Sequence, residues 1–159
     1  MSDLTITAYD EPGEADIADA MTVMSTAFEP QFGEAWTAQQ LRSMMTMPGS
    51  VLVIGRIDGK PVGFGLLRAI AGEAELLLLA VAPLHRGAGH GRRILDRCLM
   101  VAERSGAESV FLEVRDTNPA VHLYAKAGFT QYNRRKDYYL GSAGCRYDAL
   151  SFKALLVRN

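Results

Sequence analysis

The chain has 159 residues, of which 48% are hydrophobic and 22% are charged, and its formal net charge is −1. This length suits one domain with a sizeable core, so we expect a single domain over residues 1–159. The near-neutral charge excludes a global basic field that would attract nucleic acid or an anionic membrane, and any anion site must therefore be local.

Two cysteines, Cys98 and Cys145, show neither metal-ligand spacing nor a disulfide pattern. Cys98 falls on the apolar stripe of an expected helix and should be buried, whereas Cys145 lies in a glycine-rich loop as a free thiol. The N-terminus lacks a signal-peptide pattern, and no apolar run reaches the roughly 18 residues that a membrane-spanning helix needs. A cytoplasmic protein is therefore expected.

The N-terminal third is predicted to hold one strand and two helices. A strand is expected over Leu4 to Tyr9, where apolar residues weakly alternate. A helix is expected over Glu14 to Phe28, because its apolar residues recur at the helical period and would face a core. Thr37 is suited to cap a second helix that ends near Met47, before a Pro-Gly pair.

Three strands are predicted next. Val51–Ile57 and Pro61–Ile70 should form a hairpin, because the Asp58-Gly59 pair between them favours a two-residue turn. A further turn at Ala71-Gly72 leads into a strongly apolar strand over Glu75–Val81.

The second half is predicted to begin with a crossover connection. A helix over about Gly89 to Ser105 separates the strand ending at Val81 from a strand over Ser109–Arg115, which places those two strands parallel. A short helix capped by Asn118 follows. Two more strands complete the pattern, over Phe129 to about Tyr138 and Tyr147 to about Leu156. The predicted fold class is α/β, a mixed and mostly antiparallel sheet of about seven strands with about four helices.

The loop after the apolar strand carries the pattern Arg86-x-x-Gly89-x-Gly91 and opens a helix. Backbone N–H groups at such a helix N-terminus bind phosphate or pyrophosphate, and glycines let the ligand approach the main chain. A Walker-type site is excluded because its Gly-Lys-Ser/Thr motif is absent. A dinucleotide-binding motif is poorly supported, because it would follow the first strand rather than the fourth. The glycines could also serve only a sharp turn, although one glycine would suffice for that.

These residues resemble a known family. Val81-Ala82-Pro83 followed by Arg86-x-x-Gly89-x-Gly91 resembles the acetyl-CoA signature of the GCN5-related N-acetyltransferase (GNAT) superfamily. The resemblance continues through Leu112-Glu113-Val114-Arg115, Asn118, Leu123-Tyr124-x-x-x-Gly128-Phe129, Arg134-Arg135 and Tyr138-Tyr139. Over about residues 73–155, half of the chain, it is similar to the bacterial ribosomal-protein alanine N-acetyltransferases of the RimI type.

The resemblance implies a GNAT fold and direct transfer of acetyl from acetyl-CoA to a primary amine, with a protein N-terminus as the expected acceptor. The pantetheine arm would pair with a strand edge, and the pyrophosphate would bind loop amides. The implied cofactor-binding residues are Leu79, Ala80, Val81, Arg86, Gly87, Ala88, Gly89, His90, Gly91, Arg92 and Asn118. Side-chain identity should matter little there except at Gly89 and Gly91, and no metal is expected to take part.

Glu113 is the candidate general base by this resemblance. Attack on a thioester needs a neutral amine, and a free α-amino group has a pKa of roughly 8. A carboxylate acting directly or through one water can take the proton. Glu113 could instead be a solvated or ion-paired strand residue, because it shares a face with Phe111 and Arg115 whose exposure the alternation does not decide.

Tyr124 is the candidate general acid by the same resemblance. A phenol near the sulfur can protonate the leaving thiolate, so no cysteine nucleophile is needed. Its spacing from Val121 is equally compatible with ordinary helix packing.

The acceptor side is less defined. Tyr138 and Tyr139 could wall a peptide groove or be structural, and Trp36 could bind the acceptor or, as we favour, staple the following helix. The segment Phe28–Gly49 matches the family poorly, and Lys136-Asp137 adds one residue to its pattern. Two other functions stay open: acetylation of a small amine or a lysine side chain, and CoA binding without catalysis. The expected assembly is a monomer or a homodimer.

Overall fold

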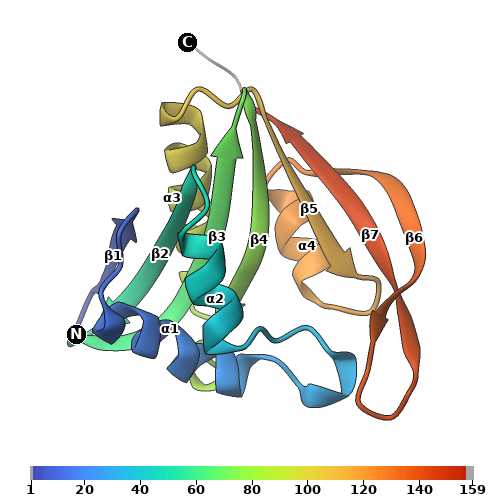
Figure 1. The fold of residues 1–159 in the computed structure, drawn as a ribbon, viewed down its shortest axis with the longest axis horizontal. Coiled ribbons are helices and arrows are strands. Elements are labelled where there is room, and N and C mark those ends of the chain that lie inside the picture. The colour runs from blue at the N-terminus through green and yellow to red at the C-terminus, as the bar shows by residue number, and fades with distance from the viewer. Residues whose placement is uncertain (1, 157–159) are drawn as a thin grey trace.

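A computed structural model describes residues 2–156 as a seven-stranded sheet with four α-helices packed on it (Figure 1). The strands are β1 (Leu4–Tyr9), β2 (Ser50–Ile57), β3 (Lys60–Ile70), β4 (Glu73–Val81), β5 (Ser109–Arg115), β6 (Thr130–Leu140) and β7 (Arg146–Leu155). The helices are α1 (Glu14–Ala27), α2 (Ala38–Met45), α3 (His90–Arg104) and α4 (Ala120–Lys126), with 3-10 turns η1 (Pro30–Phe32) and η2 (Pro83–His85). The expected domain bounds include residues 1 and 157–159, which lie outside the described residues.

The strand order is β1-β2-β3-β4-β5-β7-β6, and β4 and β5 form its parallel pair. One core cluster packs α1 and α2 against one sheet face, and a second packs α3 and α4 against the other (Figure 1). No helix in the described part of the chain is long and apolar enough to cross a bilayer. The predicted mixed α/β sheet with its parallel crossover is confirmed.

Local signals explain several element boundaries. The Thr37 hydroxyl accepts the N–H of Gln40 at 3.1 Å and the Gln40 side chain accepts the N–H of Thr37 at 2.7 Å, a capping box that starts α2. Asp58 and Gly59 both have positive φ, 51° and 76°, as a tight hairpin turn requires. The β3–β4 turn has the same form, which lets β4 begin at Glu73, two residues before the expected start.

The stripe of α3 is buried as expected, including Cys98, whose thiol pKa is raised to about 12 by burial. Cys145 is exposed in the β6–β7 turn, and both cysteines are free thiols.

A β-bulge in β4 opens the sheet. Leu66 pairs with Leu78 and Leu67 with Leu76, so Leu77 is an extra residue that turns the strand. Core contacts of β4 change face at this point, from the α3 side at Leu76 to the α1 side at Leu78. The β4–β5 register accordingly covers only Glu73 to Glu75 on β4, and the rest of β4 diverges from β5.

Candidate active site

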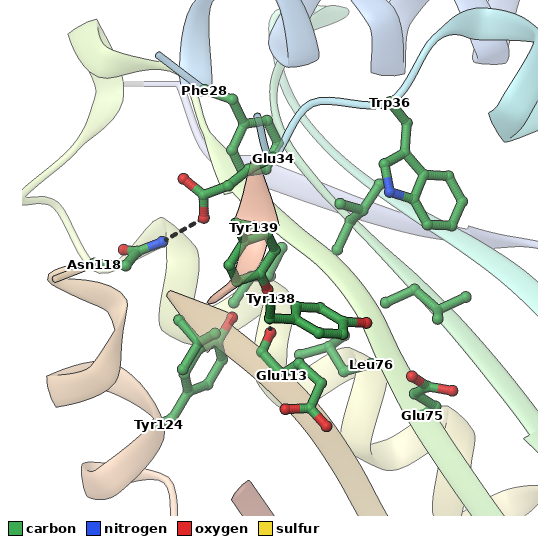
Figure 2. A pocket seen from close by; sticks show the side chains of 14 residues that line it. Phe28, Glu34, Trp36, Glu75, Leu76, Glu113, Asn118, Tyr124, Tyr138 and Tyr139 are labelled. Atoms are coloured by element: carbon green, nitrogen blue, oxygen red, sulfur yellow. Dashed lines mark hydrogen bonds between the residues drawn. The ribbon is translucent and has the colours of Figure 1, made fainter. Parts of the chain in front are cut away.

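Two adjoining cavities occupy the gap between the diverging strands. The large cavity, about 660 Å³, is lined by the end of β4, the loop before α3, the start of α4 and the α1–α2 connection (residues 28–37). The small cavity, about 160 Å³, is lined by β4, β5, β6 and the same connection (Figure 2). Four residues line both cavities: Phe28, Glu34, Leu79 and Asn118.

Seven of the eleven expected cofactor-binding residues line the large cavity: Leu79, Ala80, Val81, Arg86, Gly87, Gly91 and Asn118. The other four, Ala88, Gly89, His90 and Arg92, lie in or next to the same loop without lining the cavity. Gly89 is the N-cap of α3 with φ 83°, a conformation that favours glycine.

Two arginines, Arg86 of the loop and Arg92 in the first turn of α3, form contacts within the protein. The Arg86 guanidinium donates to the backbone oxygens of Val81 at 3.0 Å and Ala27 at 2.8 Å, which ties the loop to the end of α1. Arg92 forms an exposed ion pair with Asp96 at 2.9 Å. Both guanidinium groups are therefore bonded to protein groups, and the expected role of main-chain groups in this site stays a prediction.

Asn118 is held on both sides of its amide. Its Oδ1 accepts the N–H of Ala120, the first residue of α4, at 2.9 Å, although Pro119 and not the expected Asn118 occupies the N-cap position. Its Nδ2 donates to Glu34 at 3.4 Å (Figure 2). Glu34 also pairs with Arg115 at 3.1 Å, and both side chains are almost buried. Arg115 further stacks on the Phe32 ring, 3.5 Å from the centroid, and its guanidinium bonds the Thr117 hydroxyl.

Glu113 faces the small cavity and is ion-paired as well. One carboxylate oxygen lies 3.1 Å from the Arg135 Nε, and the other accepts the Ser151 hydroxyl at 2.6 Å. The side chain is only 16% exposed, so the face it shares with Arg115 is largely shielded from solvent. The ion pair that one interpretation of Glu113 expected is therefore present. The position of Glu113 on the small cavity also agrees with the other interpretation, in which it is the general base. Its catalytic role stays a prediction.

Glu75 adds a second carboxyl group that the sequence analysis missed. It lines the small cavity on the same side as Glu113, away from Asn118 (Figure 2). Burial, and then the charge of Glu113, raises the pKa of Glu75 above its usual range. A glutamate directly before the apolar run Leu76–Val81 was the signal that could have identified it. Glu34 had no such signal, because it lies in the segment that matches the family poorly.

Tyr124 lines the small cavity from α4 and packs against Phe129 and Phe152 at ring distances of 5.7 and 6.5 Å. Burial raises the pKa of its phenol, which therefore stays protonated near neutral pH. Tyr139 lies nearby, where its hydroxyl donates to the Glu113 backbone oxygen at 3.4 Å (Figure 2). Tyr124 is thus both a packing residue and a cavity residue.

Lys136 and Asp137, where the sequence pattern departs from the family, lie in a bulge of β6. The register moves from Arg135 opposite Ala149 to Tyr139 opposite Tyr147, and Asp137 has φ 54°. The Asp137 N–H donates to Asp148 at 2.9 Å, which fixes the bulge. Tyr138 and Tyr139 follow directly and line the small cavity.

The α1–α2 connection closes against the β6–β7 turn. Phe32 meets Tyr147 edge to face at 5.1 Å. Gly33 and Gly141 lie so close to the opposing backbones that a Cβ would fall 2.1 Å from the Leu140 oxygen and 1.9 Å from the Gln31 oxygen. Trp36 lines the small cavity and also packs against the core cluster around α1 and α2, so the structure agrees with both interpretations of it.

Comparisons with known proteins agree with this geometry. Residues 19–129 match the Acetyltransferase (GNAT) family. A ribosomal protein bS18-alanine N-acetyltransferase of Haemophilus influenzae is 34% identical over 89 residues, 56% of this chain and 61% of that protein. The Escherichia coli protein of the same name is 34% identical over 94 residues, 58% of this chain and 63% of that protein. The match therefore spans about three fifths of the length of these relatives.

Solved structures extend the likeness over the whole fold. The crystal structure of the Escherichia coli ribosomal-protein-alanine enzyme has a TM-score of 0.85 and 25% identity, covering 99% of this chain and 96% of that one. An acetyltransferase of Salmonella typhimurium solved with acetyl-CoA shares the fold, with a TM-score of 0.76, 18% identity and coverage of 99% and 96%.

Proposed function

The chain belongs to the Acetyltransferase (GNAT) family, and we propose that it transfers the acetyl group of acetyl-CoA to the N-terminal amine of a protein, with a ribosomal protein as the favoured acceptor. One observation carries the proposal. The diverging edge of β4 and the glycine loop of α3 open on the large cavity, which adjoins the small cavity beside Glu113 and Tyr124.

The residues present fit acetyl-CoA. Beyond Glu75, β4 presents main-chain groups without a β5 register partner, which suits the amides of a pantetheine arm. The N-terminus of α3 offers backbone N–H groups and a helix dipole for the pyrophosphate. Asn118 lines both cavities and would donate a hydrogen bond to the cofactor. When bound, the cofactor supplies an activated thioester.

The chain's own residues would manage the protons. Glu113 would accept the proton of the amine, directly or through one water, and Tyr124 would hold a phenolic proton for the thiolate that leaves. Burial raises the pKa of Tyr124, so the proton is present at neutral pH, although the phenol is a weaker acid than it would be in water. An N-terminal amine, with a pKa of roughly 8, is a less demanding nucleophile to deprotonate than lysine at about 10.4.

Two observations support an N-terminal amine as the acceptor. The relatives are named for acetylation of a ribosomal-protein alanine. A small cavity of about 160 Å³ suits a small first residue better than a large one. We also propose one domain over residues 1–159, acting as a monomer or homodimer in the cytoplasm, where acetyl-CoA and new ribosomal proteins are both present.

The test is an acetylation assay with the purified chain. Peptides with different N-terminal residues are compared with polyamines, aminoglycosides and lysine peptides, and CoA binding is measured by calorimetry. We expect heat on CoA titration and preferred turnover of an alanine N-terminus. Turnover of small amines alone would overturn the acceptor, and CoA binding without any acetylation would identify a binding module instead.

A further inference from the structure

Building on the proposed acetyl transfer, we infer that Glu34 is a positioning residue: its carboxylate bridges Arg115 and Asn118 and so orients the Asn118 amide at the junction of the two cavities. The residue comes from the α1–α2 connection, on the acceptor side of the site. The group it orients would contact the cofactor.

The first half of the bridge is a buried ion pair. The Glu34 Oε1 lies 3.1 Å from the Arg115 Nε, and the side chains are only 10% and 7% exposed. Arg115 is itself fixed, because its guanidinium stacks on Phe32 and bonds the Thr117 hydroxyl. Separating such a pair would leave a buried charge unpaired, so the carboxylate is held firmly in one place.

The second half reaches Asn118. The other Glu34 oxygen accepts from the Asn118 Nδ2 at 3.4 Å. The Asn118 Oδ1 is already committed to the N–H of Ala120. An amide with a partner at each end cannot rotate freely, and Nδ2 carries two hydrogens, of which Glu34 takes one. The second remains to donate to a ligand.

The location of Glu34 gives this bridge a functional meaning. Glu34 and Asn118 both line both cavities, and Figure 2 shows them facing each other. One carboxylate therefore joins the segment that walls the acceptor side to the amide proposed to hold the cofactor. A merely structural ion pair would contribute to stability alone, which makes the two roles separable.

The experiment is a double-mutant cycle on Glu34 and Asn118. Glu34→Gln removes the charge, and Glu34→Asp keeps the charge beside Arg115 while shortening the reach to Asn118. The matched control is Glu14→Gln, which removes an exposed ion pair to Arg42 at 3.1 Å. For each variant, KM for acetyl-CoA, kcat, Kd for CoA and Tm are measured.

We expect each Glu34 variant to raise KM for acetyl-CoA and Kd for CoA roughly tenfold, the size of effect that loss of one hydrogen bond to a charged group produces. Glu34→Asp should raise both constants while its Tm stays close to that of the parent protein. Glu14→Gln should change neither constant. In the Asn118→Ala background, Glu34→Gln should add nothing, because the two residues act as one unit.

The inference would be overturned if the fold-changes of Glu34→Gln and Asn118→Ala in Kd for CoA multiplied in the double variant. A lower Tm with KM for acetyl-CoA and Kd for CoA both unchanged would also overturn it. Failure of the parent protein to acetylate any amine would refute the proposed function instead. In that case the double-mutant cycle, measured as Kd for CoA, would still decide the role of Glu34.

Discussion

Gly141 offers a direct test of the contact between the α1–α2 connection and the β6–β7 turn. In Gly141→Ala, the new Cβ would stand 1.9 Å from the carbonyl oxygen of Gln31, whereas real Cβ contacts stay beyond 3.0 Å. The opposing atom belongs to the backbone, so no side chain can yield. One of the two segments must therefore retreat by roughly 1 Å, a shift at which positioning effects on rate become large.

The expected magnitude follows from what the connection carries. Overpacking of this kind costs about 1–3 kcal/mol of stability. Glu34 and Trp36 lie in the displaced connection and line the small cavity. A 1 Å misplacement of such groups can cost about a hundredfold in rate. We expect kcat/KM for the acceptor to fall by about 10- to 100-fold, measured as CoA release at saturating acetyl-CoA, with urea unfolding run in parallel.

Gly144→Ala in the same turn is the matched control. Gly144 has φ 78°, so alanine is strained there by roughly 1–2 kcal/mol. No atom lies within 4 Å of the new Cβ, however, and the connection would not move. The control should lose stability and keep kcat/KM. If Gly141→Ala also kept kcat/KM, the reasoning that this contact walls the acceptor site would be refuted.

Three further predictions concern single side chains. Tyr124→Phe should lower kcat by about a hundredfold with little change in cofactor affinity, because it removes only the proton donor; steady-state kinetics showing the parent kcat would remove Tyr124 from the mechanism. Gly91→Ala should fold normally, since its Cβ would lie 3.4 Å from Val81, yet weaken CoA binding by crowding the ligand; calorimetry giving equal affinity would contradict this. The raised pKa of Glu75 means that the folded state binds the carboxyl proton more tightly than the unfolded state does. The contribution of protonated Glu75 to the free energy of unfolding is therefore present at low pH and lost as pH rises through the folded pKa. Glu75→Gln should therefore raise Tm near pH 7 and leave it almost unchanged near pH 4, and the same Tm gain at both would argue against the assignment.

The fold could be predicted because its signals are local. Asp58-Gly59 sets a hairpin through positive φ, and Thr37 starts a helix through its own hydroxyl. The crossover to Ser109–Arg115 is parallel for reasons of chain geometry alone. The bulge at Leu77 could not be foreseen in the same way, because four successive leucines carry no alternation that would mark an extra residue.

The site was predictable only in part. The glycine loop, Glu113 and Tyr124 carry motif signals, and the structure places them around adjoining cavities. The ion pair between Glu34 and Arg115 joins residues far apart in the chain, which no spacing rule relates. The Arg86 side chain likewise bonds a backbone oxygen of α1, a contact set by tertiary packing rather than by its motif.

The three-residue register between β4 and β5 divides the sheet into a four-stranded block and a three-stranded block that meet at one corner. Rotation about that corner would change the gap between the blocks while leaving every antiparallel ladder intact. A ligand bonded to both sides of the gap would fix that angle and make the blocks unfold as one cooperative unit. Amide hydrogen exchange over residues 76–81 should then slow sharply on cofactor addition, which links occupancy of the site to rigidity of the whole sheet.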